Sequence, residues 1–193
     1  MGWLYMPSLG GHSGPRQYLN AQFTYEREDR RVRVIRSSLV KMRTYYAAVE
    51  IVPTAGGREV IAVVCLVRYN PRDAEGCVFG YKDMDETMGP CEAECPAAIL
   101  DLLTPTGSEY ALAWRERCRA VLVKRASIPK LRDGDLVVFT EPIKFTDGSE
   151  HRRMKVVVDR HRPGAVRFRP PGGGGLYRIS SMDRLTFSVV RVS

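Results

Sequence analysis

The segment from Thr44 to Asn70 restricts the possible folds most. It contains two runs of β-branched and apolar residues, "TYYAAVEIV" and "REVIAVVCLVRYN", joined by "PTAGG". Such runs on either side of a short Gly-containing turn predict a β-hairpin. The second run has so few polar positions that it is typical of a central strand, buried on both faces. We therefore expect the N-terminal part to be built on an antiparallel sheet.

Patterns around this hairpin predict further elements. Arg and Val alternate in "RVRVIRSSLVKM", which is the period-2 pattern of a half-buried strand, and "CVFGYKD" adds a shorter strand. Helices are expected from about Pro15, from Pro96 in "PAAILDLLT", and from Ser108, which is a good N-cap. The helix after Ser108 should bury one apolar stripe against the sheet, made of Tyr110, Leu112, Ala113, Trp114, Cys118, Val121 and Leu122.

From Ile128 onward the pattern contains only strands. Five short strand-like runs are separated by "RDGD", "TDGS", "RPGA", "PPGGGG" and "SSMD". Five strands with tight Gly and Asp turns in so short a segment predict a small SH3-like β-barrel. The expected fold class is thus α+β: a small antiparallel sheet with two or three helices over residues 1–127, including an acidic loop at 70–110, and a five-stranded barrel over 128–193.

Composition narrows the location of the protein. No stretch is long and apolar enough to span a bilayer, and the first residues lack the pattern of a signal peptide. Five scattered cysteines, an odd number, favour reduced thiols over a disulfide framework. We expect a cytoplasmic protein without a membrane partner.

The charge distribution indicates an anionic partner, either nucleic acid or an acidic protein. The net charge is +8, yet residues 70–110 carry two basic and nine acidic residues, so the flanking segments are strongly basic. The candidate nucleic-acid-binding residues lie in the predicted barrel, in "HRRMK", "DRHRPG" and "RFRPP". They are Arg152, Arg153, Lys155, Arg160, Arg162, Arg167 and Arg169. Alternation around Phe168 predicts that its ring faces the core and that the neighbouring arginines face solvent, where they can contact phosphates.

The acidic segment "GYKDMDETMGPCEAECPAAILDLLTP" has three interpretations. Zinc binding by Cys91 and Cys95 is disfavoured because a structural site needs four ligands and no second close pair is present. Catalysis is the alternative, with Glu86 and Glu92 as acid–base groups and Cys91 as nucleophile near a helix N-terminus. Docking onto the basic surfaces of the chain itself is favoured. We accordingly assign no catalytic residue, metal or cofactor in the first instance.

The chain resembles an uncharacterised bacterial family whose members are often carried on plasmids, phages and integrated elements. The resemblance is carried by "MGW" at the start and by "FGYKDMDETMGPCEAECPAAILDLLTPTGSEYALAWRERCR". It implies an accessory protein of a mobile genetic element, a setting in which small proteins act on nucleic acid or on host defence. The expected function is non-enzymatic binding of nucleic acid, or of a host defence complex that handles it, and the alternative is a small enzyme that uses the acidic loop.

Overall fold

The computed structural model describes residues 2–69, 78–159, 165–180 and 182–191, and it divides the chain into two compact units, Met1–Val123 and Lys124–Ser193. The α+β class expected from the sequence is confirmed. The elements are β1 (Leu4–Met6), α1 (Pro15–Gln22), β2 (Tyr25–Glu26), β3 (Arg30–Val40), β4 (Thr44–Pro53), β5 (Glu59–Tyr69), β6 (Phe79–Asp85), η1 (Glu86–Met88), α2 (Ala97–Leu100), α3 (Glu109–Ala126), β7 (Leu136–Lys144), β8 (Glu150–Val158), β9 (Val166–Arg169), η2 (Met182–Arg184) and β10 (Phe187–Val190).

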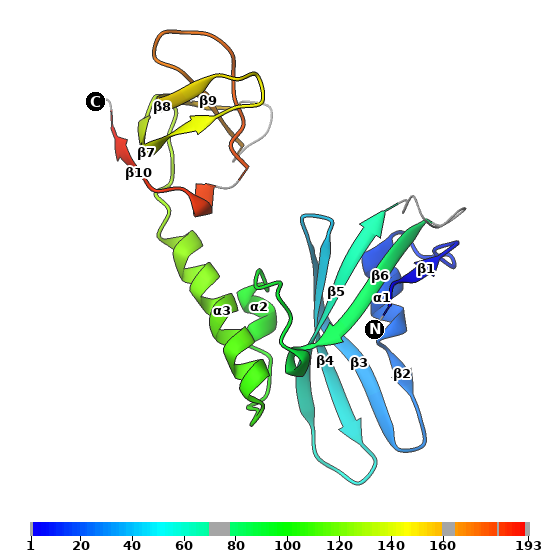
Figure 1. Ribbon diagram of the computed structural model, residues 1–193. Coiled ribbons are helices and arrows are strands. Elements are labelled where there is room, and N and C mark those ends of the chain that lie inside the picture. Colours follow the sequence, from blue (N-terminus) through cyan, green and yellow to red (C-terminus); the bar gives the residue numbers. More distant parts are fainter. Residues whose placement is uncertain (1, 70–77, 160–164, 181, 192–193) are drawn as a thin grey trace. The chain divides into compact units, whose positions relative to one another are not determined.

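The first unit is an antiparallel sheet with the strand order β1-β6-β5-β4-β3-β2, with α1 on one face and α2 and α3 on the other (Figure 1). Alternation along β4 divides the core accordingly. Tyr45 joins the cluster that contains Leu19 of α1, whereas Tyr46 joins the cluster of α2 and α3. Because both faces are covered, β4 and β5 read as nearly continuous apolar runs. The hairpin predicted from those runs is confirmed, and β5 is an interior strand.

Two expectations about the helices are only partly right. The helix expected over 96–104 is confined to α2, which ends at Leu100. The chain beyond it continues to β5, where the N–H of Thr104 donates to the carbonyl oxygen of Val60 at 3.0 Å. In α3 the predicted stripe is only partly right. Trp114 is fully buried as expected, but Tyr110 and Leu112 are 70% and 51% exposed. The face that packs on the sheet is shifted around the helix, and it includes a charged residue, Arg115.

The second unit is a four-stranded antiparallel sheet with the order β10-β7-β8-β9, curled into a half-barrel around Phe139, Met154 and Phe168 (Figure 1). A register shift between Val138 and Ile143 of β7 marks a bulge, which bends the sheet. Within the described residues, the fourth of the five expected strand-like runs, which contains Tyr177, forms only an isolated bridge to Phe168, whereas the fifth run forms β10. The expected five-stranded closure is therefore not shown.

No helix in the described part of the chain has the length and apolar character needed to cross a membrane.

The β3–β4 turn contains two residues in the left-handed region. Lys41 has φ 52° and Met42 has φ 56°, and the N–H of Arg43 donates to the carbonyl of Val40 at 3.0 Å. Positive φ at both central residues is the pattern of a type I′ turn, which normally holds Asn and Gly. A non-glycine residue in this region costs on the order of 1 kcal/mol or more.

Replacing Met42 with Gly should therefore raise the free energy of unfolding of the first unit by about 1 kcal/mol. Urea denaturation followed by tryptophan fluorescence measures this, since Trp3 and Trp114 both lie in Met1–Val123. Met42→Ala keeps the left-handed strain and serves as the control, with little expected gain. Equal midpoints for the Gly and Ala variants would contradict the interpretation.

Candidate nucleic-acid interface

Four of the predicted cations lie on one face of the second unit. Along β8, Met154 and Val156 point into the core, which places Arg153 and Lys155 on the opposite face. Along β9, Phe168 is fully buried, which places Arg167 and Arg169 on that same opposite face. The expected separation of the aromatic ring from the arginines is thus observed. We call the four residues Arg153, Lys155, Arg167 and Arg169 the basic face.

The strand register brings these charges close together. Lys155 lies directly opposite Arg169, and Arg167 lies opposite Val157, one pair further along. Residues directly opposite in an antiparallel pair have Cβ atoms about 4.5–5.5 Å apart, and like charges in such positions destabilise a sheet. No member of the basic face makes an ion pair with a residue that the structure describes. The charges of the basic face are therefore not neutralised by an ion pair within the described part of the chain.

The other predicted cations are placed differently. Arg152 shares the side of β8 that carries Met154, and its Nε donates to the carbonyl oxygen of Phe139 at 3.2 Å. Adjacent residues of a strand point to opposite faces, so Arg152 is separated from Arg153. Arg160 and Arg162 lie outside the described residues.

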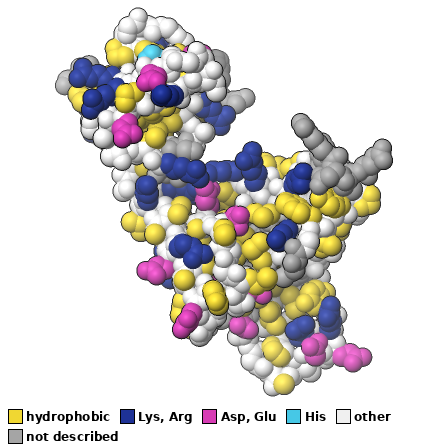
Figure 2. Space-filling view, viewed as in Figure 1, with side chains coloured by type: hydrophobic (Ala, Val, Ile, Leu, Met, Phe, Trp, Pro, Cys, Tyr) yellow, Lys and Arg dark blue, Asp and Glu magenta, His cyan; other side chains and the backbone are white. Residues whose placement is uncertain are grey.

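One further arginine borders this region. A shallow pocket of about 280 Å³ beside β9 is lined by Arg167, Arg178 and Asp159, among others. Arg178 was missed at the sequence level, although it alternates with half-buried Tyr177 and Ile179 and is itself exposed. That period-2 pattern in "LYRIS" was the available signal. In the view of Figure 2, Lys and Arg side chains are exposed over both units, consistent with the excess of basic residues.

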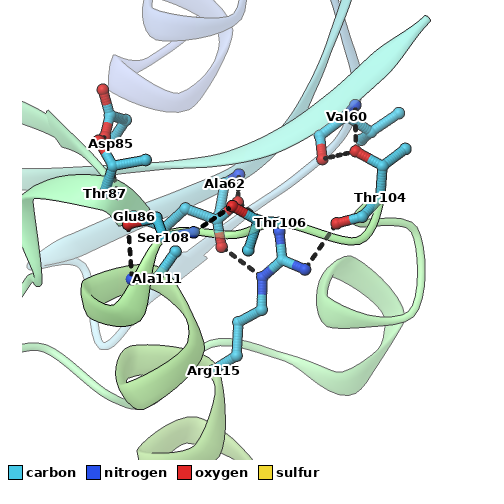
Figure 3. A network of polar contacts seen from close by, with 10 residues as sticks. All are labelled: Val60, Ala62, Asp85, Glu86, Thr87, Thr104, Thr106, Ser108, Ala111 and Arg115. Carbon is cyan, nitrogen blue, oxygen red and sulfur yellow. Dashed lines mark hydrogen bonds and ion pairs between the residues drawn. The ribbon is translucent and has the colours of Figure 1, made fainter.

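Glu86, a catalytic candidate, is an anchor inside the first unit (Figure 3). Its side chain is 1% exposed, and its two carboxylate oxygens accept from Nε and Nη2 of Arg115, each at 2.6 Å. The backbone N–H of Ala62 in β5 donates to the same carboxylate at 3.1 Å, and Nη1 of Arg115 donates to the carbonyl of Thr104 at 2.7 Å. The network joins β5, η1, α3 and the loop before α3. Its polar groups bond one another and present no free group to a substrate.

The other catalytic candidates differ from Glu86 in burial and in their contacts. Cys91 is exposed, Glu92 is half-buried, and the backbone carbonyl of Glu92 accepts from the indole N–H of Trp114 at 2.8 Å. Cys95 and Cys118 are buried in the core between the sheet and α3. Among the described residues, no group of three or more His, Cys, Asp or Glu side chains is arranged to hold a metal ion.

The acidic segment is fastened by cations of the chain itself, as the docking interpretation expects. Besides the Arg115–Glu86 pair, Lys41 in the β3–β4 turn pairs with Glu94 at 2.7 Å. A guanidinium nitrogen of Arg117 donates to the carbonyl of Pro90 at 2.8 Å. The described part of the segment is therefore held between the turn and α3.

Removing the carboxylate of Glu86 should destabilise the first unit strongly. Glu86→Ala leaves the guanidinium of Arg115 buried without its counter-charge, a loss of about 3–5 kcal/mol in the free energy of unfolding. Glu94→Ala, which breaks the more exposed pair with Lys41, should cost no more than about 1 kcal/mol. Chemical denaturation compares the two variants, and equal losses would show that the Glu86 network is not an anchor.

The cysteines should differ in reactivity. Burial raises the pKa of the Cys118 thiol to about 11 and raises the pKa values of Cys65 and Cys95 further, so these thiols stay protonated and inert at pH 8. The exposed thiol of Cys91 should react with a disulfide reagent in the native protein, and Cys91→Ser should remove one reactive equivalent. Unchanged stoichiometry in Cys91→Ser would contradict the exposure of Cys91.

Comparison with known proteins gives one match. A family model described as a domain of unknown function, DUF6927, matches residues 105–182. The matched region takes in α3, β7, β8 and β9, and so residues of both units, Arg115 and the basic face included. No curated protein matches the chain, and no solved structure does.

Proposed function

We propose that the half-barrel of Lys124–Ser193, which we interpret as an SH3-like barrel, binds nucleic acid through the phosphate contacts of its basic face, without catalysing a reaction. The observation that carries the proposal is the cross-strand pair of Lys155 and Arg169, flanked by Arg153 and Arg167, none of which makes an ion pair with a described residue. A phosphate backbone supplies the missing negative charges at regular intervals.

The chemistry of the face favours phosphates over bases. Three of its four cations are arginines, whose planar guanidinium groups bind phosphate oxygens bidentately. Phe168, the aromatic residue between Arg167 and Arg169, is fully buried and cannot stack on a base. Contacts to phosphate position a protein on nucleic acid without reading sequence. We therefore expect this face to bind nucleic acid of any sequence.

The family resemblance indicates which target the protein is expected to bind. It is carried by "MGW" and by the segment from Phe79 to Arg119, and it favours the nucleic acid of a mobile genetic element, or a host defence complex containing nucleic acid, as the target. The enzymatic alternative is supported less well, because Glu86 is buried and bonded to Arg115, whereas Cys91 is exposed.

The test is a variant with Arg153, Lys155, Arg167 and Arg169 all replaced by Gln. Binding to duplex DNA of any sequence should weaken, and the slope of log affinity against log salt should fall by about 3–4, since each phosphate contact contributes about 0.9. Fluorescence anisotropy over a salt series measures both quantities. Because the side chains lie outside the core, circular dichroism should show an unchanged fold.

Arg152→Gln is the matched control, because it removes a neighbouring positive charge that lies on the other side of β8. It should leave the salt slope nearly unchanged. Equal slopes for the wild type and the fourfold variant would remove the basic face as a nucleic-acid interface. If the wild-type protein fails to bind DNA or RNA even at low salt, the expected partner of the basic face is an acidic protein instead.

A further inference from the structure

The first unit carries a groove beside the β3–β4 turn. It has a volume of about 580 Å³, within the range of small-ligand sites, and its lining includes Trp3, Met42, Arg43, Arg68, Tyr69 and Glu92. Four separate segments supply these residues: the chain before β1, the β3–β4 turn, the end of β5 and the segment before α2. The groove lies entirely within Met1–Val123.

The walls of the groove combine aromatic surface with positive charge. The guanidinium of Arg68 lies over the ring of Trp3, at 5.8 Å from its centroid, as in a cation–π pair. Tyr69 is 39% exposed and Met42 is 56% exposed, so large apolar side chains reach the surface beside these charges. Aromatic rings next to arginines form the kind of surface on which unpaired bases stack while their phosphates are neutralised.

The rim of the groove is held in a strained conformation. Lys41 and Met42 both have positive φ, although neither is Gly, and the turn projects them beside Arg43. The turn is fixed at its base, since the N–H of Val67 in β5 donates to the carbonyl of Arg43 at 2.7 Å. Strained backbone of this kind persists only where the surrounding structure holds it, and it is common at ligand sites.

The charge of the groove selects among nucleotide ligands. Among its described lining residues, Lys41, Arg43 and Arg68 are cationic and Glu92 is anionic, and Lys41 is paired with Glu94, outside the lining, at 2.7 Å. Basic residues thus outnumber acidic ones in the lining, which favours an anionic ligand. The described lining contains no glycine whose backbone N–H groups would cradle the several phosphates of a free nucleoside triphosphate.

We propose that this groove binds an unpaired nucleotide of single-stranded nucleic acid, with the base against Trp3 and Tyr69 and the phosphodiester near Arg43 and Arg68. The carboxylate of Glu92 is then placed as an acceptor for an amino group of the base. This inference does not rest on the basic face of the second unit, because no residue of that unit lines the groove.

Trp3 itself reports on occupancy of the groove. Trp3 is half-buried in the groove wall, whereas Trp114 is fully buried and keeps a constant environment. A short single-stranded oligodeoxynucleotide added to the full-length protein should quench tryptophan fluorescence, and Trp3→Phe should remove most of that response. A blunt duplex of the same sequence should not quench, because its bases are already stacked and paired.

Affinity measured by anisotropy of the labelled single strand gives the second readout. Trp3→Leu and Tyr69→Leu should each weaken single-strand binding about tenfold, the usual effect of losing one stacked base, and leave duplex binding unchanged. Tyr110→Leu is the matched control, since Tyr110 is 70% exposed on α3 and is not part of the lining. It should change neither affinity.

If Trp3→Leu fails to fold, Met42→Glu provides a second test of single-strand binding. Met42 lies at an exposed turn, where a carboxylate disturbs no core but repels a phosphodiester, so single-strand affinity should fall further in Met42→Glu than in the uncharged Met42→Gln. Quenching that survives in the fourfold basic-face variant would separate this site from the proposed function. Single-strand binding that is unaffected by Trp3, Tyr69 and Met42 substitutions, or the absence of quenching, would overturn the inference.

Discussion

The buried pair of Glu86 and Arg115 is the interaction on which the first unit depends. Taking two charges out of water costs several kcal/mol per ion, and the bidentate geometry and the added bonds to Ala62 and Thr104 must offset that cost. The pair fixes α3 against β5, and α3 in turn holds the acidic segment through Trp114 and the carbonyl of Glu92. One wall of the groove is therefore positioned by an ion pair that does not line it.

The sequence predicted the strands of the first unit well, because burial on one or both faces imposes a period of two or a continuous apolar run. It predicted the start of α1 and the cap of α3 for equally local reasons: Pro15 is the first helical residue, and Ser108 accepts from the N–H of Ala111 at 3.4 Å. The sequence did not predict local structure that depends on a residue far away in the chain. Arg115 lies on the buried face of α3, where Glu86 neutralises its charge, and the chain after α2 runs along β5, where Thr104 bonds to Val60.

The candidate sites also contain features that a local pattern predicts and features that depend on distant residues. Alternation placed Phe168 inside and Arg167 and Arg169 outside, since the positions of side chains along one strand are a local property. Grouping Arg152 with Arg153 ignored that rule, and the closeness of Lys155 to Arg169 required the register of two strands. The groove could not be predicted from the sequence, because residues 3, 42, 68 and 92 come together only through the β3–β4 turn and the order of the strands in the sheet.

Acidic and basic residues have different uses in the two units. In the first unit the carboxylates of Glu50, Glu86 and Glu94 are each bonded to at least one cation of the chain, and Glu50 is shared by Arg33 and Arg58. These ion pairs hold segments of the first unit together. The four cations of the basic face have no such partners among the described residues, and two of them oppose each other directly across strands. An arrangement that the isolated sheet would disfavour is understandable if its counter-charge belongs to another molecule.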